Sequence, residues 1–239
     1  MSPLLAGRWA LVTGGSRGIG LAVARALIGD GARVLCLARS GRRLDDAVQS
    51  LGKGAGAVPC NLASSNEIDD AVATVVATCG GAPDILVQGA GHFPLAPFQE
   101  TSPADFGGTM QVNLIGPYRL AQPLAALMRS RGSGHLVTIG SVADRVAFPE
   151  NVAYSASKFG ARAVHEVLRE ELRSSGVRAT LVSPGPVDTT IWDAIDPDSR
   201  PGFTPRSRML TPDAVADAIR WVVTRPPEVN VDELRLGRA

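Results

Sequence analysis

A short apolar run that leads directly into a glycine-rich turn is the feature that most restricts the fold of this chain. Residues 9–13 have the apolar, partly β-branched character of a buried strand, and the turn 14–20, with four glycines, follows at once. Residues 21–28 then place apolar side chains on nearly every turn of a helix, which Gly29 and Gly31 end. The sequence therefore predicts a strand, a glycine turn and a helix in immediate succession.

This glycine turn is suited to bind a pyrophosphate. Glycine adopts positive φ without steric cost and lets the backbone approach a ligand, and the N-terminus of the following helix stabilises negative charge. The spacing Gly14-x-x-x-Gly18-x-Gly20 differs from the Gly-x-Gly-x-x-Gly dinucleotide fingerprint, and no Lys-Ser or Lys-Thr follows as in a P-loop. A turn that needs glycine for its geometry alone is the alternative. We favour the nucleotide site because the turn lies between a strand and a helix near the N-terminus.

Strand-like and helix-like segments keep alternating along the rest of the chain. At 239 residues the chain is long enough for one sizeable α/β domain. We predict a doubly wound parallel sheet of the Rossmann type, in a single domain over residues 1–239, with ligands beyond the carboxyl ends of the strands. The further strands are expected at 33–38, 57–60, 84–87, 135–139, 178–182 and 229–236. The further helices are expected at 44–51, from Ser64 or Ser65 to 79, at 105–131 with a bend or break at Pro117 and Pro123, and around Tyr154.

An arginine replaces the acidic residue that NAD-binding folds commonly carry after the second strand. Arg39 stands at this position, and Arg17 lies in the glycine turn. Two guanidinium groups suit a ribose 2′-phosphate, with Arg42 or Arg43 as possible helpers. An ordinary solvated cluster of charges is the alternative. The arginines favour NADP(H) over NAD(H), and the Michaelis constants for NADPH and NADH test this choice.

Tyr154 and Lys158 lie four positions apart, and Ser141 precedes Tyr154 by thirteen. Residues four apart share one face of a helix, so a phenol and an ammonium can meet there. A free tyrosine titrates near pH ~10, so it serves as acid or base at neutral pH only if a neighbouring cation favours its phenolate. Lys158 is placed to do this. Taken alone, such a pair is more often exposed on a surface helix, and a serine after a strand is more often a turn residue.

The order of these motifs resembles that of the short-chain dehydrogenase/reductase family over about residues 7–189. The resemblance implies that Tyr154 is the catalytic acid and base, and that Ser141 orients and polarises the substrate carbonyl. It also implies that Lys158 holds the nicotinamide ribose while lowering the pKa of Tyr154, and that Asn113 anchors a proton-relay water. The motifs that carry the resemblance are the glycine turn, Asn113, Ser141, Tyr154, Lys158 and the segment 184–189.

The same resemblance implies the cofactor contacts, with two departures. Residues 88–91 read Gln-Gly-Ala-Gly where the family usually has Asn-Asn-Ala-Gly, and Asn61 replaces a common Asp. We expect both to alter cofactor affinity rather than the reaction. The segment 184–189 resembles the loop that touches the nicotinamide carboxamide. The predicted cofactor-binding residues are Gly14, Ser16, Arg17, Gly18, Ile19, Gly20, Arg39, Asn61, Leu62, Gly89, Ala90, Gly91, Tyr154, Lys158, Pro184, Gly185, Val187 and Thr189.

Residues 190–210 are polar, contain prolines and lack a clear period, which is typical of a substrate lid. The substrate is predicted to contact Ser141, Tyr154, His92 and Trp192. The apolar residues among the candidates favour a substrate whose carbonyl is attached to a partly hydrophobic body. The alternative is that these residues pack in the core or lie on the surface of loops. Further candidates for the pocket are Phe93, Phe148, Asn151 and Phe203. We interpret Arg200, Arg206 and Arg208 as solvated loop charges.

Composition argues against several other classes of protein. A net charge of +1 without a basic stripe disfavours nucleic acid as a partner, and no apolar run approaches the ~20 residues of a membrane span. The three cysteines form no Cys-x-x-Cys pair, so we read them as reduced structural thiols of a cytoplasmic protein. No metal site is expected, because His92, His135 and His165 lack ligand spacing.

The sequence thus predicts an NADP(H)-dependent oxidoreductase that interconverts a carbonyl (ketone, aldehyde or 3-oxoacyl) and an alcohol. A non-catalytic NADP-binding sensor or interaction protein on the same fold is the alternative. The family resemblance implies a homotetramer or homodimer built on the long helices, around 105–131 and 151–174.

Overall fold

Seven parallel strands form one sheet in the computed structural model, which describes residues 4–239. Their order is β3-β2-β1-β4-β5-β6-β7. This confirms the predicted doubly wound parallel sheet; the predicted domain 1–239 also includes residues 1–3, which lie outside the described part. The strands are β1 (Trp9–Thr13), β2 (Arg33–Ala38), β3 (Ala55–Pro59), β4 (Ile85–Gln88), β5 (Gly134–Ile139), β6 (Val177–Pro184) and β7 (Glu233–Leu236).

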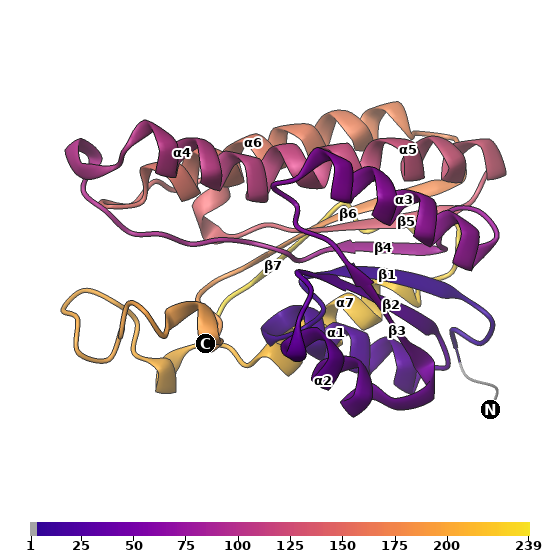
Figure 1. Cartoon of the computed structure of the whole chain (residues 1–239), viewed down its shortest axis with the longest axis horizontal. Helices are drawn as coiled ribbons and strands as arrows, with labels where there is room; N and C mark the ends of the chain where they lie inside the picture. Colours follow the sequence, from indigo (N-terminus) through magenta and orange to yellow (C-terminus); the bar gives the residue numbers. More distant parts are fainter. Residues whose placement is uncertain (1–3) are drawn as a thin grey trace.

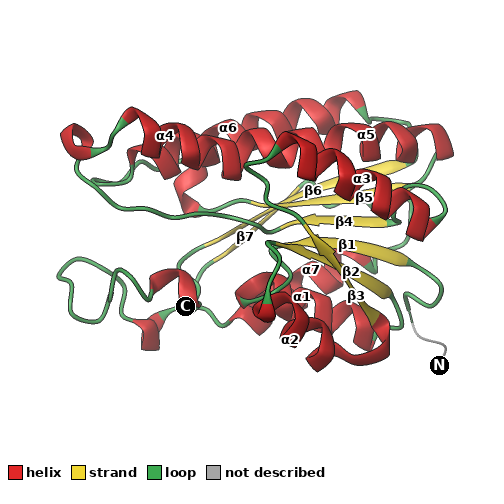
Figure 2. Cartoon of the chain, viewed as in Figure 1, coloured by secondary structure: helices red, strands yellow, loops and turns green. Residues whose placement is uncertain are grey.

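Helices cover both faces of the sheet (Figures 1 and 2). One face carries α1 (Gly18–Gly29), α2 (Arg42–Leu51) and α7 (Pro212–Val223). The other carries α3 (Ser65–Cys79), α4 (Pro103–Met110), α5 (Gly116–Arg131) and α6 (Val152–Glu171). None of these helices combines the length and apolar character needed to cross a membrane.

Each face of the sheet buries its own hydrophobic cluster. Val12 packs into the cluster beneath α1 and α7, whereas its neighbour Leu11 belongs to the cluster beneath α3 and α5. Successive residues of a strand point to opposite faces, so strands that are covered on both sides read as continuous apolar runs. This explains the unbroken apolar character of β1 and β2 in the sequence.

The strand order places a crevice at the carboxyl ends of β1 and β4. From β1 the chain continues to β2 on one side, and β4 lies on the other side. The direction of winding reverses between these two strands, so the segments that leave them diverge toward opposite faces of the sheet. The glycine turn leaves β1 at this point, and residues 89–91 leave β4.

The helix predicted at 105–131 is divided. α4 ends at Met110, a π-helical turn spans Gln111–Ile115, and α5 begins at Gly116. Pro117 lies at the start of α5, where a missing N–H costs little, and α5 continues through Pro123. The helical backbone thus continues from α4 through the π turn into α5, so neither proline breaks it, and the irregularity lies just before Pro117. Such π turns are often found at functional sites.

Local capping explains several helix ends. The Ser64 hydroxyl accepts a hydrogen bond from the Glu67 amide at 3.4 Å and begins α3 as predicted. The Thr211 hydroxyl accepts from the Ala214 amide at 3.1 Å and begins α7, a helix that the sequence analysis did not predict. The last strand, β7, begins only at Glu233 and is therefore shorter than the predicted 229–236.

Two histidines are buried in the core. His135 of β5 shares a 2.8 Å hydrogen bond between its Nε2 and Thr180 Oγ1. His165 of α6 shares a 2.9 Å hydrogen bond between its Nδ1 and Thr138 Oγ1. Burial lowers the pKa of His135 to about 3 and the pKa of His165 to about 4, because the charged imidazolium loses its hydration. Both rings are therefore neutral in the folded protein near neutral pH.

We expect mild acid to destabilise the fold. Below about pH 6.5 the unfolded chain binds protons at these two histidines and the folded chain does not, so stability falls with the pH until the folded pKa values near 4 and 3 are reached. The loss between pH 7 and pH 5 is roughly 2 kcal/mol for each histidine. Urea unfolding at both pH values measures it. A variant with His135→Gln and His165→Gln should lose less, and equal stability of the unmodified chain at pH 7 and pH 5 would contradict the prediction.

Candidate active site

A cavity of about 1400 Å³ collects nearly all of the predicted site residues at the carboxyl ends of the strands. Its lining includes segments that follow β1, β2, β3, β4, β5 and β6, as expected of a doubly wound sheet. Asn113 is the one predicted site residue that does not line it. The predicted residues in the lining are Gly14, Ser16, Arg17, Gly18, Ile19, Gly20, Arg39, Asn61, Leu62, Gly89, Ala90, Gly91, His92, Ser141, Tyr154, Lys158, Pro184, Gly185, Val187, Thr189 and Trp192.

The glycine turn forms a cradle that a side chain would fill. A Cβ atom on Gly20 would lie 2.3 Å from the carbonyl oxygen of Gly14, so only glycine fits there. Gly14 has φ +72°, and its own Cβ would lie 3.0 Å from the backbone of Ala90. No side chain caps the N-terminus of α1, whose first residue is Gly18. The free amides of this helix end are suited to hold an anionic group.

Thr13, which the sequence analysis did not single out, joins the two walls of the crevice. Its hydroxyl accepts hydrogen bonds from the amides of Gly89, at 3.0 Å, and Ala90, at 3.1 Å. Gln88, the residue before Gly89, does not line the cavity. Its side-chain nitrogen donates to the Pro117 carbonyl at 2.8 Å. The only signal for Thr13 in the sequence is its hydroxyl at the last position of the first strand.

Asn61 remains in the cavity lining. Its side-chain oxygen accepts a hydrogen bond from the amide of Ala63 at 3.1 Å. This bond fixes the amide group at the carboxyl end of β3. Asn61, which replaces the common aspartate, therefore keeps a polar side chain at the cavity wall.

An arginine cluster lines the end of the cavity next to β2. Arg17, Arg39 and Arg43 lie close enough to act on one another: burial lowers the pKa of Arg17, and the charges of Arg43 and Arg39 lower it further. Arg17 Nη1 donates to Thr190 Oγ1 at 3.1 Å. Within residues 4–239, neither Arg39 nor Arg43 forms an ion pair. An anion bound among these guanidinium groups would relieve their mutual repulsion.

Ser141, Tyr154 and Lys158 meet where β5 ends against α6. Ser141 lies close enough to Tyr154 to lower the pKa of its phenol. Lys158 is buried, its Nζ donates to the carbonyl of Ile139 at 2.9 Å, and this nitrogen lies 5.6 Å from the centre of the Tyr154 ring. The helical spacing of Tyr154 and Lys158 thus directs both side chains to the end of one strand.

Burial dominates the electrostatics of Tyr154 and Lys158. Burial raises the pKa of Tyr154 to about 12; the nearby Ser141 side chain opposes this rise, and the charge of Asp144 adds to it. Burial lowers the pKa of Lys158 to about 8, against the charge of Asp144, which raises it. Desolvation of the phenolate thus dominates the pKa of Tyr154, and a lowering of this pKa by Lys158 stays a prediction.

Asn113 braces the cavity wall from behind. It is buried in the π-helical turn, its side-chain oxygen accepts from the His92 amide at 2.7 Å, and its nitrogen donates to the His92 carbonyl at 2.8 Å. The same nitrogen donates to Ser157 Oγ at 3.0 Å. Its amide thus ties the segment after β4 to α6. A relay water at Asn113 stays a prediction.

Aromatic side chains line the cavity beside Tyr154. The Phe93 ring lies edge-on to Tyr154 at 4.6 Å between centroids, and Trp192 continues the row 5.1 Å from Phe93. Phe203 follows 6.3 Å from Trp192. Phe148 and Asn151 also line the cavity, as predicted. This part of the cavity is therefore suited to an apolar group.

Two arginines in the segment 190–210 are not free solvated charges, which corrects their interpretation. Arg206 pairs with Asp188 at 2.8 Å and with Asp193 at 2.7 Å. Arg200 pairs with Glu150 at 2.6 Å across the cavity mouth. These pairs tie the segment to its surroundings, and nothing in the sequence pattern indicated the partners. In residues 4–239, no group of three or more His, Cys, Asp or Glu side chains is placed to hold a metal ion.

Comparisons with known proteins agree with this geometry. The family model described as short chain dehydrogenase matches residues 8–200. The D-threitol dehydrogenase of Mycolicibacterium smegmatis is 36% identical over 221 residues, covering 90% of this chain and 85% of the relative. An uncharacterized oxidoreductase of Staphylococcus aureus is 30% identical over 232 residues, covering 97% of both chains. A metagenomic short-chain oxidoreductase solved in complex with NADP superimposes with a TM-score of 0.84 at 31% identity, covering 99% of each chain. The chain therefore belongs to the short chain dehydrogenase family and is an oxidoreductase that acts on CH–OH or C=O groups.

Proposed function

We propose that this protein interconverts a carbonyl compound and an alcohol with NADP(H), and that Tyr154 is the acid and base of the reaction. The observation that carries the proposal is that Ser141 and Tyr154 meet beside buried Lys158, in the same cavity as the glycine cradle and the arginine cluster. One cavity thus combines the groups for proton transfer with the groups that hold a dinucleotide.

The residues of the cavity fit a dinucleotide with a 2′-phosphate. The uncapped N-terminus of α1 would bind the pyrophosphate, and Arg17, Arg39 and Arg43 would bind the 2′-phosphate. Lys158 would hold the nicotinamide ribose through the ammonium protons that it does not donate to Ile139. A bound nicotinamide supplies or accepts the hydride. The NADP complex of the metagenomic oxidoreductase supports this choice of cofactor.

Ser141 and Tyr154 would act on the same substrate oxygen. Ser141 Oγ accepts from the Ala143 amide at 3.1 Å, which leaves its own proton available to a carbonyl oxygen. With a pKa of about 12, Tyr154 is a phenol at neutral pH, the form that donates a proton during reduction. In oxidation of an alcohol, Tyr154 would first have to lose its own proton, and the phenolate oxygen would then take the proton of the alcohol.

A substrate screen tests this function. Ketones, aldehydes and β-ketoacyl thioesters are offered with NADPH, and loss of NADPH absorbance is followed. Sugar alcohols are offered with NADP⁺, because the 36% identical relative is a D-threitol dehydrogenase. We expect turnover with at least one class. NADPH binding without turnover on any of them would instead favour the non-catalytic sensor.

We also propose that the segment 190–210 covers the substrate. Trp192 and Phe203 belong to this segment and continue the aromatic row that begins at Tyr154. Their position favours a substrate whose carbonyl is attached to an apolar group. Arg200 would hold the segment to the opposite side of the mouth through Glu150.

Exposed apolar side chains on α5 and α6 support the predicted homotetramer or homodimer. Tyr118 and Leu127 of α5 and Phe159, Val164 and Val167 of α6 are exposed. A second copy that packs against these helices would remove them from water. Light scattering in solution should give twice or four times the chain mass, and a strictly monomeric species would contradict the prediction. A cytoplasmic location stays a prediction.

A further inference from the structure

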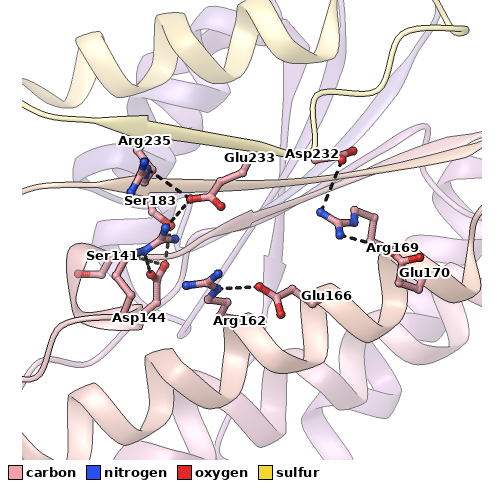
Figure 3. A network of polar contacts seen from close by, with 11 residues as sticks. Ser141, Asp144, Arg162, Glu166, Arg169, Glu170, Ser183, Asp232, Glu233 and Arg235 are labelled. Atoms are coloured by element: carbon pink, nitrogen blue, oxygen red, sulfur yellow. Dashed lines mark hydrogen bonds and ion pairs between the residues drawn. The ribbon is translucent and has the colours of Figure 1, made fainter.

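A buried carboxylate lies directly behind Ser141. The side chain of Asp144 is 0% exposed. One of its oxygens accepts hydrogen bonds from the Ser183 hydroxyl and, at 3.2 Å, from the Ser141 amide. The other accepts from Arg145 Nε at 2.7 Å (Figure 3). All these partners converge on a group that does not line the cavity.

Asp144 and Ser141 hold each other through a capping box. The Ser141 hydroxyl accepts from the Ala143 amide, and the Asp144 carboxylate accepts in return from the Ser141 amide. The carboxylate also packs against the preceding backbone, since a Cβ atom on Gly140 would lie 2.4 Å from its oxygen. The main chain of Ser141 is thus tied directly to this carboxylate, and its hydroxyl is tied to the turn that carries Asp144.

The carboxylate is held in turn by the last two strands of the sheet. Ser183 belongs to β6, and Arg145 Nη1 pairs with Glu233 of β7 at 2.7 Å (Figure 3). The charge of Asp144 adds to the rise in the pKa of Tyr154 and opposes the fall that burial causes in the pKa of Lys158. The ionisable groups include Arg145 at the end of this turn. On the elements around it they are Glu233 and Arg235 on β7, Arg178 on β6, and Tyr154, Lys158, Arg162, His165, Glu166, Arg169, Glu170 and Glu171 on α6.

We propose that Asp144 is a positioning residue of this active site, which anchors Ser141 at the end of β5 and supplies the fixed negative charge beside Tyr154 and Lys158. Its catalytic consequence rests on the proposed function, whereas its effect on Tyr154 does not require turnover. A purely structural role would preserve the shape of the site without influencing how Tyr154 ionises. The two roles can therefore be separated by removing the charge while keeping the side-chain shape.

The first test is the ionisation of Tyr154. The chain has only two tyrosines, so ¹³C-tyrosine labelling in a Tyr118→Phe background leaves one NMR signal. We expect Asp144→Asn to move the ionisation of Tyr154 to lower pH by about one unit, because a nearby negative charge no longer opposes the phenolate. Ser183→Ala, which removes a hydrogen bond to the carboxylate and keeps the charge, is expected to leave the titration in place. An unchanged titration in Asp144→Asn would overturn the proposal.

The second test is the pH profile of kcat. Asp144→Asn should shift this profile toward lower pH by about one unit, in addition to any loss of rate. A lower rate with an unshifted profile would show a structural role only and overturn the proposal. If the unmodified protein turns over no substrate, the proposed function fails, and the NMR titration still decides the role of Asp144.

Asp144→Ser is a second neutral variant. Its hydroxyl keeps an oxygen on the side of the Ser141 amide. It is expected to shift the titration of Tyr154 in the same direction. Circular dichroism and cooperative thermal unfolding establish that each variant is folded. If neither neutral variant folds, Asp144 serves folding rather than the active site, and the proposal is wrong.

Discussion

Tyr154→Phe is expected to lower kcat by about 10²- to 10⁴-fold, because the variant loses the proton that the substrate oxygen receives. The ring itself remains, so its edge-on contact with Phe93 at 4.6 Å persists and the cavity keeps its shape. Affinity for NADPH should therefore stay almost unchanged. Steady-state rates and a fluorescence titration with NADPH measure the two quantities.

The chain offers a matched control for this substitution. Tyr118 is an exposed tyrosine on α5 that does not line the cavity, so Tyr118→Phe makes the same chemical change far from the reaction. We expect it to retain its rate. Activity that survives in Tyr154→Phe would refute the assignment of the acid and base.

Arg39→Ala is expected to raise the Michaelis constant for NADPH by about 10- to 100-fold, which corresponds to the loss of hydrogen bonds to a charged group. The constant for NADH should change little, because NADH has no 2′-phosphate. Arg39 lines the cavity beside Arg17 and Arg43, and its loss would also reduce the repulsion within this cluster. The ratio of the two constants is the measured quantity.

Arg33 is the matched control, since it begins the same strand that Arg39 follows and stacks on Trp9 with its guanidinium 4.9 Å from the ring centre. Arg33→Ala should leave the ratio of the constants unchanged. A preference of the unmodified protein for NADH would contradict the assignment of the arginine cluster to a 2′-phosphate.

Much of the fold could be predicted from the sequence because its signals are local. The apolar runs of β1 and β2, the glycines of the turn and the cap at Ser64 each act through near neighbours in the chain. α7 was missed although it carries similar signals, namely Thr211 as cap, a proline at its start and apolar residues on one face. The sequence therefore contains the signals for α7, and we did not recognise them.

The remaining features involve partners far apart in the sequence. Ser183 reaches Asp144 across 39 positions, and Asn113 reaches Ser157 across 44. No periodicity or motif connects such pairs. The sequence also could not show that the pKa of Tyr154 is raised. Burial opposes the phenolate, and the helical spacing of Lys158 shows only that a cation is near.

The order of strands and helices, and the presence of a phenol, an amine and a hydroxyl at the right spacings, were determined by the sequence alone, because short-range sterics and hydrogen bonds govern them. Only the tertiary structure decided that Asp144 bonds the Ser141 amide, that Asn113 bonds the backbone of His92 behind the cavity wall and that burial raises the pKa of Tyr154. The physical reason is that desolvation and charge interactions depend on distances in the packed chain, which sequence separation does not measure.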